Sequence, residues 1–464
     1  MKNKNQQRQL ILLLISAVIV IAQTAIFAYI WYNFYDVEGV MELPFYKRGN
    51  YVIIGLYAVL TIVFYKLFGC FRVGYLRIYD TIFIQISAVL LLNFITYLQL
   101  CLTCRWRFLE HVEPMLWMTL VDIIISITWA MVSRTIYIHF NPRHELLLIY
   151  GKYSPDNLIR KLESRKDKYH IHEAISIDTD MEEIKAKIAD HGSVVLADIP
   201  SQIRNQLLKF CFAHDIRCYT VPKISDIMIM NAARINLFDT SLLLFRNNGL
   251  TLWQRFAKRT FDIIASVIGL VIASPFMLII ALCIKLYDGG PVFFTQDRLT
   301  EGGRVFKVYK FRSMRVEKPN GEYCLTRKDD DRITPVGKII RNIHFDELPQ
   351  LLNILKGDMS IVGPRPECPK LAEEYTQMIP EFGFRLKVKA GLTGYAQVYG
   401  KYNTTPYDKL KLDLTYIKKY SFLLDLQLII MTLKILFQKE NTEGIESWQT
   451  SAATEDNLEM LGKK

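Results

Sequence analysis

Four long apolar runs mark the N-terminal part of the chain, over about 10–32, 51–68, 81–102 and 115–138. Each run has the length of about 20 residues that an α-helix needs to cross a bilayer. The first run follows the basic start "MKNKNQQRQ", but it is too long for the apolar part of a signal peptide and lacks a small-residue cleavage site. The pattern therefore predicts a four-helix transmembrane domain over residues 1–140, with an uncleaved first helix.

Basic residues in the connecting segments predict the orientation of these helices. The N-terminus and the segments after the second and fourth runs are basic, whereas the loop at 33–50 carries charges of both signs. Because Lys and Arg favour the cytoplasmic side, we expect both ends of the bundle to lie inside. The prediction depends on Lys2, Lys4, Arg8, Lys66, Arg72, Arg77, Arg134 and Arg143, while Arg105 and Arg107 in the loop at 103–114 weaken it.

Residues 143–245 alternate between strand-like and helix-like segments. The strand-like segments are "ELLLIYG", "IHEAISI", "SVVLADI" and "IRCYTV", and helical periodicity separates them. This alternation predicts a parallel, Rossmann-like α/β domain over residues 141–250. The turn after the first strand, "YGKYSPDN", contains Gly151 alone and lacks the G-x-G-x-x-G pattern that holds a pyrophosphate. A regulatory or dimerising module is the better interpretation.

A further apolar stretch, at about 263–284, is also long enough to cross a membrane. Proline inside a helix removes a hydrogen bond and bends it, and here Ser274-Pro275 lies in the middle of the stretch. Basic residues flank both sides, whereas a spanning helix should have asymmetric flanks. The pattern favours a bent, re-entrant helix (about 260–286) that enters and leaves the same leaflet; a kinked fifth span is the alternative.

Composition adds a preference for anionic partners. The chain has 464 residues, 51% of them hydrophobic, and a net charge of +11. A basic balance suits phospholipid headgroups, sugar nucleotides or nucleic acid, and the absence of nucleic-acid-binding motifs makes the last the weakest. Cys101 and Cys104 form a CxxC without a second ligand pair at zinc spacing. They are interpreted as thiols at the membrane edge, and a disulfide between them stays open.

The block from 288 to 400 carries the candidate chemistry. Arginine grips phosphate oxygens with a planar fork, and several basic residues accompany the acidic pair Asp346-Glu347. Together they indicate a diphosphate site. The basic residues are Lys310, Arg312, Arg332, Arg341 and Arg365.

The acidic pair itself has two interpretations. Apolar residues at 348, 351, 352 and 355 predict a helix that ends at Gly357, and Pro349 is tolerated only in its first turn. Asp346 would then be the N-cap and Glu347 would lie just inside. Acidic residues at helix starts are common for structural reasons alone. Alternatively, Asp346 is a nucleophile whose pKa the helix end lowers, with Glu347 and a divalent ion beside it.

Five motifs carry a family resemblance over about 252–440: "KRTFD", "GPVFFTQDR", "YKFRSM", "DELPQLLNILKGDMSIVGPRP" and "GLTGYAQVYGK". Together they resemble the monotopic phosphoglycosyl transferases, bacterial sugar transferases that act on polyprenyl phosphate. The upstream layout resembles the large form of that family, in which four transmembrane helices precede a degenerate Rossmann-like domain. Two positions depart from the family pattern: His344 stands where Ser or Thr is usual, and Ala390 replaces a proline.

The resemblance implies a reaction in which a UDP-sugar gives its sugar 1-phosphate to undecaprenyl phosphate and UMP is released. It implies that Asp346 attacks the β-phosphate, that Glu347 supports it, and that Mg²⁺ is bound by both. Ser274-Pro275 matches the break of the re-entrant helix, and Lys258, Arg259 and Asp262 match its mouth. The substrate-binding residues that it implies are Lys310, Arg312, Arg341, Arg365, Gln350, Lys258, Arg259 and Asp262.

The expected fold is thus a four-helix membrane bundle, a Rossmann-like α/β domain, and a small α-rich α+β catalytic domain (251–440) with a re-entrant helix. The segment at 406–440 is interpreted as an interfacial amphipathic helix or a core helix, and 441–464 as a polar tail. The expected partners are a UDP-sugar, undecaprenyl phosphate, membrane lipid and a second copy of the chain, without nucleic acid. The expected location is the bacterial inner membrane, with catalysis on its cytoplasmic face at the first membrane step of exopolysaccharide, capsule or O-antigen synthesis.

A function of another class is a membrane scaffold or regulator of a polysaccharide complex with an inactive catalytic block. Replacement of the acidic pair or of the arginines would favour it, and both are intact in the sequence. A milder alternative gives the N-terminal part a role of its own, such as dimerisation or control of polymer length.

Overall fold

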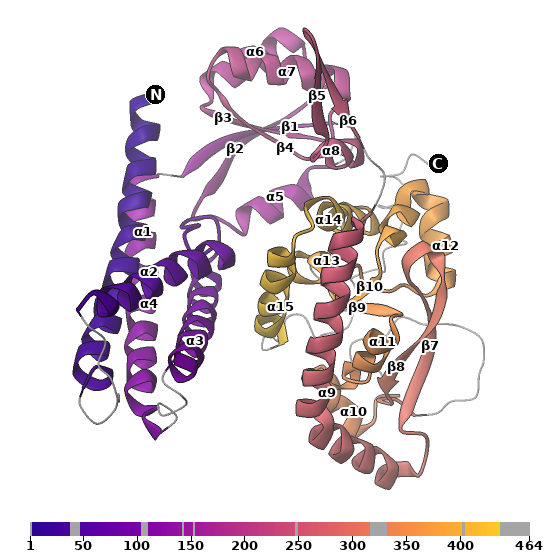
Figure 1. Cartoon of the computed structure of the whole chain (residues 1–464). Helices are drawn as coiled ribbons and strands as arrows, with labels where there is room; N and C mark the ends of the chain where they lie inside the picture. Colours follow the sequence, from indigo (N-terminus) through magenta and orange to yellow (C-terminus); the bar gives the residue numbers. More distant parts are fainter. Residues whose placement is uncertain are drawn as a thin grey trace. The chain divides into compact units, whose positions relative to one another are not determined.

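The computed structural model describes residues 2–37, 47–103, 110–141, 143–151, 154–245, 249–315, 332–400 and 404–436. It divides into two compact units, Met1–Val221 and Pro222–Lys464, and Figure 1 shows their elements in sequence colours. Three predictions fall on residues outside the described ones: the polar tail at 441–464, the partner thiol Cys104, and the charges of Arg105 and Arg107.

The four predicted N-terminal helices are confirmed as helices. They are α1 (Lys2–Ile30), α2 (Lys47–Phe68), α3 (Ile78–Thr103) and α4 (Glu113–Phe140), and α1 continues into a π-helical turn, η1 (Trp31–Tyr35). All four, with α1 and η1 taken together, are long and apolar enough to cross a membrane. The bundle is held inside by hydrogen bonds as well as by packing.

Buried polar side chains link the helices of this bundle. Asn93 of α3 donates to Asp122 of α4 at 3.0 Å and accepts from Tyr57 of α2 at 3.0 Å. Gln23 of α1 donates to Tyr65 of α2 at 2.7 Å. Each of these buried groups has its hydrogen-bond partner on a neighbouring helix, and these bonds fix the register of the helices.

The α/β domain contains a parallel sheet with the strand order β2-β1-β3-β4, as predicted. The strands are β1 (His144–Tyr150), β2 (Tyr169–Ser176), β3 (Ser193–Ala197) and β4 (Arg217–Thr220), and the helices are α5 (Asp156–Glu163), α6 (Met181–Asp190) and α7 (Ser201–Ala213). In register, Leu148 of the central strand β1 lies between Ala174 and Val195.

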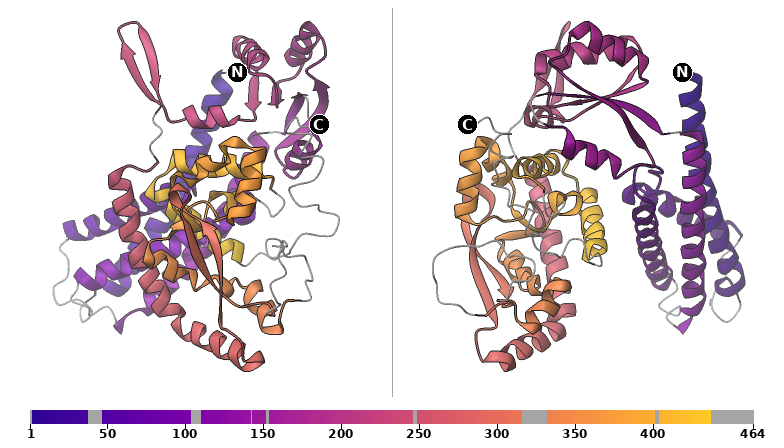
Figure 2. Two further views of the ribbon diagram at one scale, coloured as in Figure 1. Left: turned by 90° about the vertical axis from the view of Figure 1, so that its right-hand side faces the viewer. Right: turned by 180° about the vertical axis from the view of Figure 1, so that it is seen from behind.

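The two faces of this sheet follow from the alternation of side chains along β1. Leu147 and Ile149 pack with residues of α6 and α7, whereas Leu146 and Leu148 pack with residues of α5. Figures 1 and 2 show these helices on opposite faces of the sheet. The position after β1 requires a glycine, Gly151, for a steric reason: a Cβ there would lie 2.0 Å from the Asp198 carbonyl oxygen.

The C-terminal unit combines short helices with strand pairs. Antiparallel hairpins form between β5 and β6 and between β7 and β8, and β9 pairs with β10 in parallel. Its elements are α8 (Ile224–Ile229), β5 (Ala233–Leu237), β6 (Thr240–Leu244), α9 (Leu252–Asp288), β7 (Phe293–Leu299), η3 (Glu301–Gly303), β8 (Val305–Phe311), α10 (Pro335–Asn342), η4 (Phe345–Glu347), α11 (Gln350–Lys356), β9 (Met359–Val362), α12 (Pro369–Met378), η5 (Pro380–Lys387), β10 (Ala390–Thr393), α13 (Tyr395–Tyr399), α14 (Pro406–Lys419) and α15 (Phe422–Leu436).

The main core of this unit gathers distant parts of its sequence. Ile224 and Ile227 of α8 pack with Val362 at the end of β9 and with Leu410 and Leu414 of α14. Helix α8 and Leu250, which the sequence assigned to the α/β domain, therefore contribute to this core. Because α14 and Leu428 of α15 are buried in this core, the core-packing interpretation of the segment at 406–440 applies to parts of both helices.

Helix α9 bends in its second half (Figures 1 and 2). Pro275 lies inside the helix and has no N–H to donate to the carbonyl of Val271. The Ser274 hydroxyl donates to that carbonyl instead, at 2.8 Å. The serine thus supplies the hydrogen bond that the proline removes, so the chain bends without ending the helix.

Two glycine-containing segments cross closely beside β9 and β10. A Cβ on Gly391 would lie 2.1 Å from the backbone nitrogen of Gly363, and one on Gly394 would lie 2.0 Å from the Gly363 carbonyl oxygen. Contacts this short are sterically forbidden, and backbone atoms cannot rotate away. The glycines of "GPRP" and "GLTG" therefore permit this crossing.

We expect Gly391→Ala to destabilise the C-terminal unit by about 3 kcal/mol or more, because the methyl group must push two backbone segments apart. The matched control is Gly383→Ala in η5, where an added Cβ meets nothing within 4 Å, and its effect should stay within about 0.5 kcal/mol. Thermal unfolding of both variants in detergent measures the difference. Equal melting temperatures for the two variants would contradict the steric argument.

Candidate active site

The acidic pair lies in a tight turn rather than at the start of a helix. Asp346 and Glu347 belong to η4, a 3₁₀ turn closed by hydrogen bonds from Glu347 N to His344 O at 3.2 Å and from Leu348 N to Phe345 O at 3.3 Å. His344 precedes the turn with a φ of 56°, a left-handed conformation that is uncommon outside glycine. The turn joins α10 to α11.

The prediction that Asp346 caps the following helix is wrong. An N-cap carboxylate accepts from the N–H groups two and three residues later, here Leu348 and Pro349. The Leu348 N–H already donates to Phe345 O, and proline has no N–H. Helix α11 instead begins at Gln350, with Pro349 before it and no side-chain cap.

Two cations converge on Glu347. Lys310 Nζ donates to Glu347 Oε1 at 2.6 Å, and Arg365 Nη2 donates to the same oxygen at 3.3 Å. The Glu347 side chain is only 15% exposed. Burial alone would raise its pKa, but Lys310 and Arg365 outweigh burial and hold the pKa well below its usual range. Glu347 is therefore a fixed negative charge.

Asp346 has the opposite electrostatic character. Among the described residues, none donates a hydrogen bond to its carboxylate. Burial raises its pKa, and the charge of Glu347 raises it further, so that Lys310 and Arg341 offset only part of the increase. The lowered pKa expected from a helix terminus is thus wrong in sign. Asp346 is instead a carboxylate more basic than usual and open to a reactant.

The structure brings together only part of the predicted substrate-binding set. Lys310 from β8, Arg341 from the last turn of α10 and Arg365 from the segment after β9 surround the acidic pair. Arg312 instead pairs with Asp288 at the end of α9. Gln350 lies buried in the first turn of α11.

Three of the charged residues near the start of α9, which are Lys258, Arg259 and Asp262, hold that helix to the rest of the unit. Lys258 Nζ donates to Asp425 of α15 at 2.6 Å, within an almost fully buried ion pair. Asp262 Oδ1 accepts from Ser360 Oγ and from Ile361 N on β9, both at 3.0 Å. With these contacts to β9 and α15, Lys258 and Asp262 are anchors of α9 in this structure.

Arg259 connects α9 to the acidic turn indirectly. Its guanidinium donates to the carbonyls of Ile354 and Leu355, at 2.5 and 2.7 Å, where α11 ends. A cation is favourable at a helix C-terminus. Helix α11 has 7 residues and is about 10 Å long. Arg259 therefore fixes the C-terminal end of a short helix whose N-terminal end lies close to Glu347.

Asn353 fixes the side of α11. Its amide donates to Lys307 O at 2.8 Å and accepts from Tyr309 N at 2.9 Å, so that it pairs with β8 as a strand would. Lys310 follows directly on this strand. Asn353 and Asp425 were not among the predicted residues, although Asp425 had a signal, since it is a lone charge in the apolar run "FLLDLQLII".

The acidic pair fits Mg²⁺ as proteins usually hold it. Magnesium takes oxygen ligands and is commonly bound by one or two carboxylates together with substrate phosphates and water. Among the described residues, no cluster of three or more His, Cys, Asp or Glu side chains offers a complete protein cage. Asp346, which accepts no hydrogen bond from those residues, is the carboxylate of the pair that could still take a metal ion.

Comparison with known proteins identifies the family. A family model for bacterial sugar transferases matches residues 253–439. A UDP-glucose:undecaprenyl-phosphate glucose-1-phosphate transferase of Caulobacter vibrioides is 38% identical over 189 residues, which are 40% of this chain and 71% of that relative. This chain belongs to the bacterial sugar transferase family.

Two other relatives of this chain are longer than the matched region. A UDP-N-acetylgalactosamine-undecaprenyl-phosphate N-acetylgalactosaminephosphotransferase of Aeromonas hydrophila is 41% identical over 242 residues, 52% of this chain and 56% of the relative. A UDP-glucose:undecaprenyl-phosphate glucose-1-phosphate transferase of Xanthomonas campestris pv. campestris is 38% identical over 243 residues, 50% of each chain. The chain thus spans about half the length of these relatives.

We expect the two carboxylates of the transferase to respond oppositely to neutralisation. Glu347→Gln should lower the free energy of unfolding by about 1–3 kcal/mol, because Lys310 and Arg365 lose their charged acceptor. Asp346→Asn should raise it by roughly 0.5–1 kcal/mol, because it removes a charge that the folded site disfavours. Thermal unfolding of both variants at pH 7.5 tests this, and a shift of the same sign in both would contradict the assignment.

Proposed function

We propose that this protein transfers a sugar 1-phosphate from a UDP-sugar to undecaprenyl phosphate and releases UMP. The observation that carries the proposal is that the two carboxylates of the acidic pair differ in their hydrogen bonding and in their pKa. Glu347 is held by Lys310 and Arg365, whereas Asp346 is open and more basic than an ordinary carboxylate. A site with one fixed and one available carboxylate among cations is suited to attack on a diphosphate.

In the first proposed step, an Asp346 carboxylate oxygen attacks the β-phosphorus of the UDP-sugar. A bond forms between that oxygen and phosphorus, and the bond from the β-phosphorus to the bridging oxygen breaks. UMP leaves with the bridging oxygen, and the sugar phosphate stays on Asp346 as an acyl phosphate. The raised basicity of Asp346 favours the attack, and Arg341 and Arg365 lie where they can offset charge on the phosphates.

In the second step, a phosphate oxygen of undecaprenyl phosphate attacks the same phosphorus, and the Asp346 carboxylate leaves. The product is undecaprenyl diphosphate sugar, and Asp346 returns to its ionised state. Splitting the transfer into two displacements lets one carboxylate serve both substrates in turn. Mg²⁺, when held by Asp346 and Glu347, would supply further positive charge to the phosphates.

The relatives support this choice of substrates. The names of the Aeromonas and Xanthomonas proteins both include undecaprenyl phosphate, while the sugars in these names differ. The similarity of the matched region therefore supports the shared transfer reaction, and it does not indicate which sugar is transferred. The homodimer, the place in cell-surface polysaccharide synthesis and the inner-membrane location remain predictions that belong to this proposal.

The proposed membrane arrangement is a re-entrant α9, with the catalytic unit on the cytoplasmic side where UDP-sugars are made. Contacts along α9 support it. Lys258 near its start is paired with Asp425, and Asp288 at its end is paired with Arg312, all within the same unit. Ile280 and Ile284 of the second half also pack against Phe311. A helix that crossed the membrane could not keep both ends on one soluble body.

The reaction predicts that full-length protein with Mg²⁺ releases UMP from one or more UDP-sugars only when undecaprenyl phosphate is present. Asp346→Asn should lower the rate at least about 1,000-fold, because the nucleophile is lost. The exposed Asp297→Asn on β7 is a matched control that should keep nearly full activity. Coupled detection of UMP across a UDP-sugar panel, with and without a chelator, measures these rates; full activity of Asp346→Asn would refute the nucleophile assignment.

The re-entrant arrangement predicts which membrane face each segment meets. Single cysteines replace Asn33, in the turn after α1, and Lys307 on β8, in a background without native cysteines. A membrane-impermeant maleimide should label the Lys307→Cys protein only in inverted vesicles and the Asn33→Cys protein only in right-side-out vesicles. Labelling of both from the same side would overturn the arrangement, and a full crossing by α9 would give that result.

A further inference from the structure

The segment 363–367, "GPRPE", carries Arg365 to the acidic pair and is held in an unusual way. Pro364 and Pro366 have no N–H, so the segment cannot be fixed by a two-sided strand ladder. Gly363 N donates to Thr393 O at 2.8 Å, and after it the segment is held through its carbonyls. Pro364 O accepts from Gly391 N at 2.9 Å, and Glu367 O accepts from Leu299 N at 2.9 Å. These backbone bonds secure the two ends of the segment.

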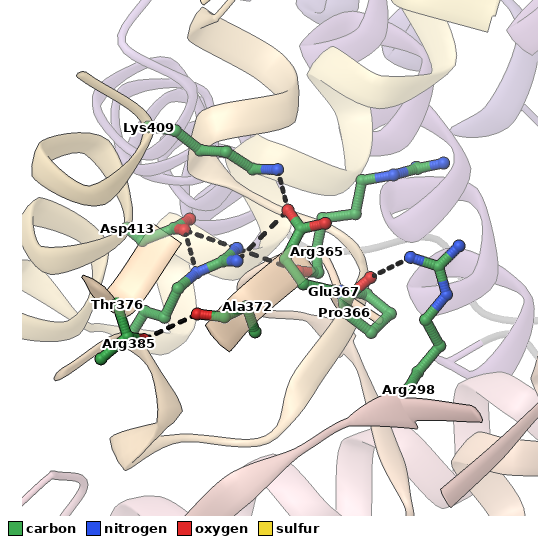
Figure 3. Close-up of polar contacts among 9 residues, drawn as sticks. All are labelled: Arg298, Arg365, Pro366, Glu367, Ala372, Thr376, Arg385, Lys409 and Asp413. Atoms are coloured by element: carbon green, nitrogen blue, oxygen red, sulfur yellow. Dashed lines mark hydrogen bonds and ion pairs between the residues drawn. The ribbon is translucent and has the colours of Figure 1, made fainter. Parts of the chain in front are cut away.

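Two arginine side chains hold the middle of the segment. Arg385 Nη2 donates to Arg365 O at 2.9 Å, and Arg298 Nη1 donates to Pro366 O at 3.1 Å (Figure 3). A cavity of about 350 Å³ lies between this segment, α12 and η5, with Pro364, Pro366 and Phe382 among its lining residues. Because close packing is missing on the cavity side, these guanidinium contacts have the larger part in fixing the backbone of Arg365.

Arg385 is itself fixed by a buried charge cluster. Its Nε donates to Asp413 Oδ2 at 2.8 Å, its Nη2 lies 2.7 Å from the same oxygen, and its Nη1 donates to Glu367 Oε1 at 3.3 Å. Lys409 also pairs with Glu367. Burial raises the pKa of Glu367, but Lys409 and Arg385 outweigh it and bring that pKa to about 2. Two cations thus face two anions, and the Arg385 side chain is only 3% exposed.

Arg365 has few contacts of its own to fix it. Its side chain is 45% exposed, and its bond to Glu347 is long, at 3.3 Å. Figure 3 shows the side chain extending away from the Arg385 cluster, while its backbone lies beside that cluster. The position of its guanidinium therefore depends on where the backbone of residue 365 is held.

We propose that Arg385 is a positioning residue for the transfer reaction, which acts by holding the Arg365 carbonyl and so fixes the Arg365 guanidinium relative to Glu347 and the donor phosphates. This inference rests on the proposed function. Arg385 contacts backbone on the far side of Arg365 and not the acidic pair. A displacement of about 1 Å in a charged group at a reacting centre can cost about 100-fold in rate. A firmly held backbone at Arg365 should therefore raise the rate of transfer.

A double-mutant cycle tests the proposal with Arg385→Lys, Arg365→Lys and the combined variant. Lysine keeps the charge of Arg385 but loses the planar fork that reaches Asp413 and the Arg365 carbonyl together. In the wild-type background, Arg385→Lys should lower kcat for UMP release by about 10- to 100-fold, with KM for the UDP-sugar changed less than about threefold. In the Arg365→Lys background it should cost less than about threefold further.

The control is Lys387→Met. Lys387 lies on the same 3₁₀ helix, η5, where its ammonium stands over the Phe384 ring, and its replacement should leave kcat unchanged. Equal losses from Arg385→Lys in both backgrounds would show structural support only and would overturn the proposal. If Arg385→Lys does not fold, the cycle is run with Asp413→Asn, which keeps Arg385 and loosens it. A wild-type protein that releases no UMP would contradict the proposed function itself, whereas active wild type with additive losses would contradict only the positioning role.

Discussion

The constraint on which the site depends is that two adjacent carboxylates in one turn cannot be stabilised equally. Lys310 and Arg365 both approach the same oxygen of Glu347, so the favourable charge interactions go mainly to that residue. Asp346 is left with burial and with the charge of its neighbour. The asymmetry needs no special side chain at position 346. It follows from where the cations stand, and the surrounding elements therefore matter chiefly because they set the positions of Lys310, the turn and Arg365.

Side-chain hydrogen bonds from α9 and α11 set these positions. Asn353 ties α11 to β8, the strand of Lys310. Arg259 closes the far end of α11, and Asp262 holds β9, after which the chain reaches Arg365. Helix α9 thus aligns α11 and β9 within the C-terminal unit, and in the proposed arrangement it is also the element that enters the membrane. Its charged residues lie at its two ends: Arg255, Lys258, Arg259 and Asp262 in the first turns, and Lys285 and Asp288 in the last.

Local patterns predicted local structure well and side-chain partners poorly. Apolar runs gave the N-terminal helices, and alternation gave the parallel sheet, because both depend on periodicities within one segment. Capping of α11 by Asp346 failed because the Leu348 N–H was already taken within the turn, a detail of 3₁₀ geometry that spacing does not contain. Arg312 was grouped with Lys310 on composition, yet it pairs with Asp288, since a long side chain can reach either face and only the tertiary fold decides. Arg385 carried no local signal, because its partners are distant in sequence.

The bend in α9 also relates the acidic turn to the membrane. A straight helix of 37 residues would be about 55 Å long, well beyond a hydrocarbon core of about 30 Å. At the bend, Phe276 contacts the ring of Phe345, with centroids 6.1 Å apart, and Phe345 directly precedes Asp346. The deepest part of a re-entrant helix would thus touch the turn that carries Asp346, the proposed nucleophile. An acceptor whose phosphate sits at the membrane surface and whose chain lies in the bilayer requires this proximity, because its phosphate cannot travel far into water without its lipid.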